Sequence, residues 1–345
     1  MKSKLSLTMV LLILSTMLLS ASGTEYTKQY KKGWLKGSVS DLRISNKFGE
    51  VKINDMGGDS VTIKVVITVE GQSESKARDV FNNIQISFGK SGGMASAETK
   101  FENDFHNKQS FSIDYLINIP KDKNLDINNK YGNVILNELN AKGNFDVSYG
   151  SITAGDMKAP SGSPIKLIVS YGKADLESIN KANLEFKYSK LYGNEIGSLM
   201  LNTKYSTVNL HKTSNITIDS KYDAINIDEV GSLKSESKYT NYKIDVLTEN
   251  FILDTGYGSV RINKVEPKFE KIQIISSYGG INIGMDNLNY KLQADCDYCD
   301  IKYPADRYKG NRIKENHSFS LDGNVGTGGG TVKISSRYGG VKLEE

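Results

Sequence analysis

The sequence predicts an all-β fold, a parallel β-solenoid in which the chain winds as a single-stranded β-helix with about 17–22 residues per coil. Three observations predict it. The 345 residues include 19 tyrosines against 11 phenylalanines and one tryptophan. Most of these tyrosines recur at a nearly constant spacing, and apolar residues alternate with a period of two on both sides of them. We expect the winding to be right-handed, as in other parallel β connections.

The tyrosine spacing defines the repeat. Ten tyrosines follow one another at intervals of 17 to 22 residues, and four consecutive intervals are 17. A fixed period of this size is typical of a repeat architecture. Tyr338 follows the last of them after forty residues, which predicts that it ends the series. The ten are Tyr131, Tyr149, Tyr171, Tyr188, Tyr205, Tyr222, Tyr239, Tyr257, Tyr278 and Tyr298.

Each repeat has apolar residues at fixed distances from its tyrosine. Before Tyr205 the apolar residue is Leu201, and after it come Val208 and Leu210. This period-two alternation indicates strands, and its phase changes just after the tyrosine, where Gly or Ser predicts a corner. Stacked coils would therefore carry a row of tyrosines along one corner. We expect a structural ladder of buried rings with hydroxyls in water, although a platform for carbohydrate rings is an alternative.

The first 23 residues have the pattern of a secretory signal peptide. Lys2 and Lys4 precede an apolar stretch from Leu7 to Leu19, and Ala21 and Gly23 supply small residues for cleavage. The apolar run is short for a membrane-spanning helix, which is the alternative interpretation. Export to the periplasm, the outer surface or the medium of a bacterium is therefore expected, with no transmembrane segment left after cleavage.

The rest of the chain divides by how well it fits the repeat. Residues 24–56 predict a first coil around Phe48, and residues 121–303 predict the main series of coils. Residues 57–120 break the pattern and predict a β-rich insertion or cap, with a short helix from Ser73 to Phe81. Residues 304–345 predict an irregular, Gly-rich segment and a final coil. We expect these two segments to cover the open strand edges of the solenoid.

The charge balance excludes one class of partner. The chain has 44 basic and 40 acidic residues, a formal charge of +4, which falls to +2 when Lys2 and Lys4 are removed with the signal peptide. A value this small gives no reason to expect nucleic-acid binding. The sequence does not indicate an oligomeric state.

Two rows of charge are expected on one face. Four lysines directly precede ladder tyrosines on successive coils and predict a cationic strip for an acidic glycan. Acidic residues two positions earlier on the same face offer the plainer alternative, a solvated face of ion pairs. The lysines are Lys187, Lys204, Lys221 and Lys238, and the acids are Glu185, Asp219, Glu236 and Asp254.

The remaining candidates for chemistry are few. Cys296 and Cys299 form a C-x-x-C pair across a predicted corner, where haem, thioredoxin and zinc patterns are incomplete and a local disulfide is one alternative. His106, His211 and His317 lie far apart, so we expect surface residues. No catalytic, cofactor-binding or metal-binding motif occurs in the sequence.

Three blocks of sequence resemble a known family. They are residues 113–132, the repeated Tyr-Gly coils, and the Gly-rich turn before residues 332–340. Together they are similar to the bacterial putative-adhesin family of exported β-solenoid proteins, a family of unknown function. The resemblance implies a β-solenoid of the cell envelope and implies no enzymatic residues.

We therefore expect a non-enzymatic envelope protein, an adhesin or polymer-binding scaffold whose partner is an acidic glycan or another envelope protein. Two alternatives stay open. One is a carbohydrate-active β-helix enzyme, a lyase or hydrolase, which would need clustered carboxylates or a metal site in a groove. The other is a scaffold for periplasmic stress signalling.

Overall fold

The computed structural model describes residues 18–20, 23–56, 58–71, 73–102, 105 and 108–344. The predicted signal peptide therefore lies outside the described residues, apart from Leu18–Ser20 and Gly23. The protein is all-β, and its strands form a mostly parallel sheet, which is consistent with a β-solenoid. The chain divides into two units, Met1–Ala154 and Gly155–Glu345, which are described separately below.

Unit 1 combines parallel and antiparallel strands. Its elements are β1 (Leu18–Ser20), β2 (Gly23–Leu35), a 3-10 turn (Lys36–Ser38), β3 (Asp41–Lys47), β4 (Val51–Asn54), β5 (Ser60–Gly71), α1 (Glu74–Asn82), β6 (Ile84–Ser91), β7 (Met94–Phe101), β8 (Ser110–Asn118), β9 (Asn124–Lys130), β10 (Val134–Leu139) and β11 (Gly143–Ser148). Strand β12 (Ser151–Met157) runs across the division between the units.

The first coil of unit 1 consists of β3 and β4. Strand β3 pairs in parallel with β7 and β9, and β4 pairs in parallel with β8 and β10. Strands β2 and β8 flank β5 in antiparallel pairing, so residues 23–35 lie outside the first coil, which differs from the predicted coil of residues 24–56. Every second residue of β2 from Tyr26 to Trp34 pairs with a valine or isoleucine of β5, and these β5 side chains are fully buried.

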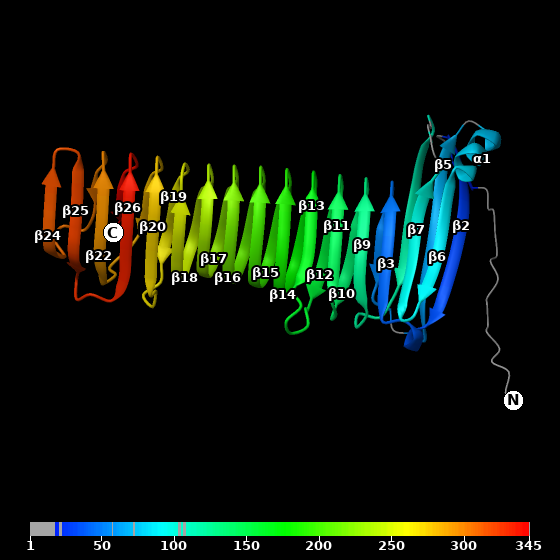
Figure 1. Ribbon diagram of the computed structural model, residues 1–345, viewed down its shortest axis with the longest axis horizontal. Coiled ribbons are helices and arrows are strands. Elements are labelled where there is room, and N and C mark those ends of the chain that lie inside the picture. Colours follow the sequence, from blue (N-terminus) through cyan, green and yellow to red (C-terminus); the bar gives the residue numbers. More distant parts are fainter. Residues whose placement is uncertain are drawn as a thin grey trace. The chain divides into compact units, whose positions relative to one another are not determined.

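The predicted helix is present as α1, which lies beside β5 and β6 (Figure 1). The Ser73 side chain accepts a hydrogen bond from the Lys76 backbone N–H at 3.4 Å, as expected of an N-cap residue. Ala77 and Val80 are its buried residues. In the described part of the chain, no helix has the length and apolar character needed to cross a membrane.

Unit 2 carries most of the repeats. Its strands are β13 (Ile165–Ser170), β14 (Lys173–Lys187), β15 (Lys190–Lys204), β16 (Thr207–Lys221), β17 (Ala224–Lys238), β18 (Asn241–Thr255), β19 (Val260–Val265), β20 (Lys271–Ser277), β21 (Ile281–Gly284), β22 (Tyr290–Asp297), β23 (Ile301–Lys302), β24 (Tyr308–Glu315), β25 (Ser318–Val325), β26 (Gly330–Arg337) and β27 (Val341–Glu344).

Strands β14 to β17 repeat with a constant register. Each pairs in parallel with the next, and every residue lies beside the residue 17 positions further along the chain (Figure 1). The apolar residues four before each tyrosine, such as Leu184, Leu201 and Ile218, are buried in the interior. Equivalent residues therefore form rows along this part of unit 2, as the spacing of 17 predicts.

The C-terminal strands of unit 2 do not follow chain order. Strand β26 lies between β20 and β22, and β27 lies between β21 and β23, all in parallel pairing. The coil of Tyr338 is thus placed between those of Tyr278 and Tyr298, and the predicted position at the end of the series is wrong. All three coils carry the same alternation of apolar residues, so the repeat alone does not specify their order.

Residues 304–330 are also more regular than predicted. Strands β24 and β25 form an antiparallel hairpin, and β25 continues the sheet beyond β22 (Figure 1). Phe319 and Leu321 of β25 are buried. This hairpin lacks the tyrosine template, which is why the repeat pattern gave no sign of it.

Candidate functional site

The corner of each coil is built around its tyrosine. In the corners of unit 2 from Tyr171 to Tyr239, the tyrosine has a φ between +51° and +63°, a left-handed conformation that is unusual for a bulky residue. The backbone N–H of Tyr188 donates to the Lys204 carbonyl at 3.0 Å, and that of Tyr205 donates to the Lys221 carbonyl at 3.1 Å. The strained residue is thus held by the following coil, and its side chain points outward.

The residue after the tyrosine points inward and links successive corners. The Gly172 N–H donates to Ser189 Oγ at 3.1 Å, and the Ser189 N–H donates to Ser206 Oγ at 3.1 Å. The Ser206 N–H donates to Asp223 Oδ1 at 2.6 Å. Each buried side chain therefore satisfies a backbone donor of the preceding coil, which explains the small polar residues at this position.

Asp223 is the one acidic member of this inward row. Its side chain is buried and accepts hydrogen bonds from Ser220 Oγ at 2.7 Å and from the Lys221 N–H at 2.9 Å. Burial nevertheless raises the pKa of the carboxyl group above its ordinary value, because desolvation outweighs these hydrogen bonds. The carboxylate is fully engaged with the corner, so we assign it a structural role.

Other corners have glycine after the tyrosine. A Cβ on Gly258 would meet the carbonyl oxygen of Thr240, and the residue has a φ of +147°. A Cβ on Gly279 would likewise meet the carbonyl oxygen of Gly258. A side chain at either position would collide with the backbone of the preceding corner, so glycine is required there.

The tyrosines of unit 2 form a continuous ladder. Neighbouring ring centroids are 4.7–5.1 Å apart, and the rings of Tyr222 and Tyr239 lie within 2° of parallel. The rings are 41–54 % exposed, so the prediction of buried rings is wrong. Each ring face is covered by the next ring, and only ring edges and hydroxyls meet water. Stacking of sugar rings on these faces is therefore blocked along the ladder.

The lysine row lies beside the ladder. Lys187, Lys204, Lys221 and Lys238 are exposed and in register on β14 to β17. Lys187 pairs with Glu185 at 2.6 Å, and the Lys204 ammonium lies 5.3 Å from the centre of the Tyr205 ring. The other two form no ion pair with any residue that the structure describes.

The acidic row is in register on the same strands but does not neutralise the lysines in pairs. Glu185, Asn202, Asp219, Glu236 and Asp254 lie side by side on β14 to β18. Only the ion pair of Glu185 with Lys187 joins the two rows, and the other acids in the row are exposed. The plainer interpretation, a face of ion pairs, therefore describes β14 alone.

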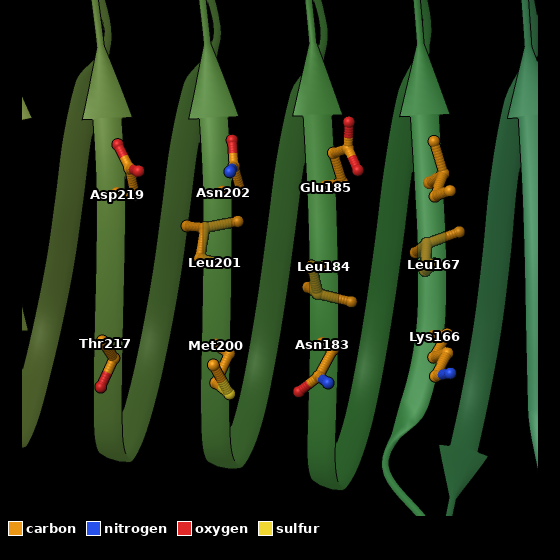
Figure 2. A pocket seen from close by; sticks show the side chains of 11 residues that line it. Lys166, Leu167, Asn183, Leu184, Glu185, Met200, Leu201, Asn202, Thr217 and Asp219 are labelled. Atoms are coloured by element: carbon orange, nitrogen blue, oxygen red, sulfur yellow. The ribbon is translucent and has the colours of Figure 1, made fainter.

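A shallow groove of about 380 Å³ runs across β13 to β16 on this face (Figure 2). One side of it carries Glu185, Asn202 and Asp219, and the other carries Asn183, Met200 and Thr217. Ile168 and Met200 are exposed by 39 % and 61 %, which makes the groove largely apolar. The repeat pattern does not predict this groove, because its exposed apolar residues occupy two different positions of the repeat and form no row.

Unit 1 has a shorter version of the same corner row. Phe48 stacks on Tyr131 at 5.1 Å, and Tyr131 stacks on Tyr149 at 5.0 Å. Lys47 and Lys130 directly precede Phe48 and Tyr131 and pair in register. These two lysines and Arg337, which precedes Tyr338, were not among the basic residues predicted for the row. Inspection of the residue before the aromatic residue in every coil identifies these basic residues.

The cysteines and the described histidines make contacts with neighbouring residues of the fold. Cys296 and Cys299 are joined by a disulfide across the corner of Tyr298. His211 Nδ1 lies 2.8 Å from Asp228 Oδ2 on the surface, and His317 stacks on Tyr298 at 4.8 Å. His106 lies outside the described residues. Within the described ranges, no group of three or more His, Cys, Asp or Glu side chains could hold a metal ion.

Comparison with known proteins gives structural neighbours only. No family model and no curated protein matches the chain. A putative cell adhesion protein from Clostridium sporogenes is 9% identical, with 92% of this chain and 99% of that chain covered and a TM-score of 0.21. A putative adhesin from Parabacteroides merdae is 12% identical, with 73% and 95% covered and a TM-score of 0.31. A putative adhesin from Parabacteroides distasonis is 10% identical, with 74% and 97% covered and a TM-score of 0.32.

Proposed function

We propose that this chain is an exported, non-enzymatic β-solenoid protein of the bacterial cell envelope that binds an acidic glycan through its lysine row. The proposal rests on the row of four exposed lysines on successive in-register strands. Among the residues that the structure describes, only Lys187 of this row has an acidic partner. The signal-like first 23 residues support export, and the right-handed winding of parallel β connections supports a right-handed solenoid.

The energetics of the row favour a polyanion. Strands in a sheet lie about 4.8 Å apart, and two like charges at that distance repel by at most about 1 kcal/mol in water. A chain of carboxylates or sulfates along the row would relieve this repulsion at several strands together. The tyrosine hydroxyls on the adjoining corner offer hydrogen bonds to sugar hydroxyls at the same repeat.

Binding is favoured over catalysis by the arrangement of the carboxylates. Glu185 is engaged with Lys187, and Asn202 stands on the strand between Glu185 and Asp219. A glycoside hydrolase needs two carboxylic groups facing each other across the scissile bond, with one of them protonated. Side chains fixed in one surface row do not face each other in this way. Among the described residues, no comparable feature favours an envelope protein as the partner or a scaffold role in stress signalling.

A binding assay with a charge-matched control tests the proposal. The mature protein is titrated with a soluble polyuronate at several salt concentrations, together with the double variant Lys204→Glu, Lys221→Glu. The control is Lys181→Glu, Lys243→Glu, which changes two exposed lysines outside the row and alters the net charge equally. We expect the row variant to bind more than tenfold more weakly with a shallower salt dependence, and the control to change less than twofold.

Equal losses in the two variants would mean that binding follows net charge, and the lysine row would not be the site. Unchanged binding of the row variant would reject the proposal directly. Release of reducing ends from the polymer during the titration would show catalysis and would favour the enzyme instead.

A further inference from the structure

The ladder of unit 2 brings nine phenol rings into one uninterrupted row. Its order is Tyr171, Tyr188, Tyr205, Tyr222, Tyr239, Tyr257, Tyr278, Tyr338 and Tyr298, with eight neighbouring pairs at 4.7–5.1 Å between centroids. This separation matches the spacing of strands, about 4.8 Å, so successive rings are close to translational copies. Equivalent carbons of neighbouring rings are therefore also separated by about that distance.

The reactive part of each ring faces solvent. The ladder rings are 41–54 % exposed, whereas Tyr115, Tyr242 and Tyr290 are at most 2 % exposed. Because stacking covers the ring faces, the exposed surface consists of the hydroxyl and the ring edge beside it. The carbon next to the hydroxyl is where phenoxyl radicals couple, and in the ladder it has an identical carbon on each neighbouring ring.

We propose that the tyrosine ladder is a site of oxidative crosslinking, in which neighbouring coils become joined by dityrosine. Each of two adjacent phenols loses one electron and its hydroxyl proton. The two radicals form one carbon–carbon bond between their ortho carbons, and the hydrogens of these carbons move to the two oxygens. The oxidant is hydrogen peroxide acting through a haem peroxidase, and it takes up two electrons and two protons to give two molecules of water.

The positions of the links follow from the strand order. Links within the regular region join residues 17 apart, such as Tyr188 to Tyr205. Links of Tyr338 to Tyr278 and to Tyr298 would fix the inserted coil on both sides. The crosslinks would therefore bind coil to coil along the direction in which a solenoid is pulled apart, which is useful to a protein at a cell surface. This consequence does not depend on the ligand of the lysine row.

Substitution by phenylalanine gives a test that preserves the fold. Phe48 stacks on Tyr131 at 5.1 Å in unit 1, so a phenyl ring fits this corner without the hydroxyl. Two variants are made on a Tyr149→Phe background, which removes the Tyr131–Tyr149 pair. The alternating variant has Phe at positions 188, 222, 257 and 338, and the block variant has Phe at positions 171, 188, 205 and 222.

Both variants keep five ladder tyrosines of unit 2 but differ in their neighbours. The block variant retains four of the eight adjacent pairs, and the alternating variant retains none. In the alternating variant, neighbouring phenols are two strands apart, about 9.6 Å, which is too far for coupling. Any difference between the variants thus reports adjacency and not the number of tyrosines.

The full chain is treated with peroxide and a haem peroxidase at low protein concentration, and crosslinks are located by peptide mass spectrometry. We expect links between ladder neighbours within one molecule, each with a loss of two hydrogens. The block variant should keep about half of the wild-type yield, and the alternating variant should fall at least tenfold. The peptide map distinguishes ladder links from a link between Tyr303 and Tyr308, whose rings are 5.2 Å apart. Oxidation of the exposed Met200 adds an oxygen to the mass, so it is not mistaken for a crosslink.

Similar yields in the alternating and block variants would overturn the proposal, because adjacency would then not matter. Links that form mainly between molecules, or that do not involve ladder neighbours, would overturn it as well. Circular dichroism of both variants shows whether the β-fold is retained, and the wild-type map alone decides the matter if either variant is unfolded.

Discussion

Strands β14–β17 and strands β20–β27 of unit 2 use the same coil template in two different ways. In the first region each strand pairs with the next strand along the chain, and the register advances by 17 residues each time. In the second region β26 and β27 are inserted between coils that precede them in the sequence, and an antiparallel hairpin continues the sheet. The corners differ too, with inward Ser, Asp or Thr in the first region and mainly Gly in the second.

The two regions show which structural features a repeated sequence specifies and which it leaves open. The template decides which residues face inward and which residues of two coils lie side by side. It is the same for every coil, so any coil can in principle neighbour any other. Strand order depends instead on the connections, and the turn from Gly326 to Gly329, with positive φ at Gly326 and Gly328, brings the chain back between earlier coils.

Truncation of an equivalent core residue in each region should destabilise the protein more than any other change considered below. Ile218 of β16 and Ile334 of β26 are both buried four residues before a ladder tyrosine. Replacement of either by Ala should cost about 2–5 kcal/mol of stability, because it leaves a cavity in a packed interior. Urea unfolding measures the cost, and hydrogen exchange maps where protection is lost.

The exchange maps should differ between these two variants. Ile218→Ala should lower protection in β15, β16 and β17, which are consecutive in the sequence. Ile334→Ala should lower it in β26 and, earlier in the sequence, in β22 and β25, because β22 joins the preceding coils of unit 2 through β26. Loss of protection confined to β26 and β27 would contradict the inserted order.

A smaller effect is expected at the two kinds of corner. Gly258→Ala forces a Cβ against the Thr240 carbonyl in a backbone conformation that suits glycine, which should cost about 2–3 kcal/mol. Ser206→Ala leaves the Ser189 N–H without its acceptor, which should cost about 1–2 kcal/mol. Thermal and urea unfolding of both variants test this ranking. A Gly258→Ala protein as stable as the wild type would show that the corner backbone is free to relax.

The smallest effect concerns the pH dependence of the regular region. The pKa of Asp223 is raised by burial, so the folded state holds the proton to higher pH than the unfolded state does. The contribution of this group to stability is therefore fully present below its unfolded pKa, about 3.9, and is lost as pH rises through the folded value. Asp223→Ser gives this corner the same residue as the preceding corner, which has Ser206, and removes the titratable carboxyl group.

The stability difference between wild type and Asp223→Ser, measured by urea unfolding, should thus shift against the wild type as the pH rises from about 4. Tyr242 also faces Asp223, but its pKa is raised and it stays neutral over this range. The opposite slope would mean that the hydrogen bonds from Ser220 and the Lys221 N–H outweigh desolvation.

Much of the fold was predictable because period-two alternation and a fixed tyrosine spacing leave few alternatives. The strands, the row positions and helix α1 follow from the sequence in this way. The antiparallel strand β2 and the β24–β25 hairpin did not, because their residues lack the template and their partners are distant. The exposed ladder rings were mispredicted because sequence gives no measure of how far a corner residue projects.

The lysine row was predictable as a row, but its partners were not. Position in the repeat places Lys187 and Lys204 side by side, whereas side-chain torsions decide that Lys187 contacts Glu185 and Lys204 lies over Tyr205. The groove was not predictable, since it depends on how exposed side chains of neighbouring strands leave space between them.

The inserted coil limits the order in which the coils can form while the chain is synthesised from its N-terminus. Strands β14 to β18 can each pair with the strand that was synthesised just before, so this region can grow in chain order. Strand β22 gains its neighbour β26 only after the β24–β25 hairpin has emerged. A nascent chain that stops before β26 lacks the strand that joins β22 to β20, so its edges stay unpaired and exposed to non-native association until β26 is made.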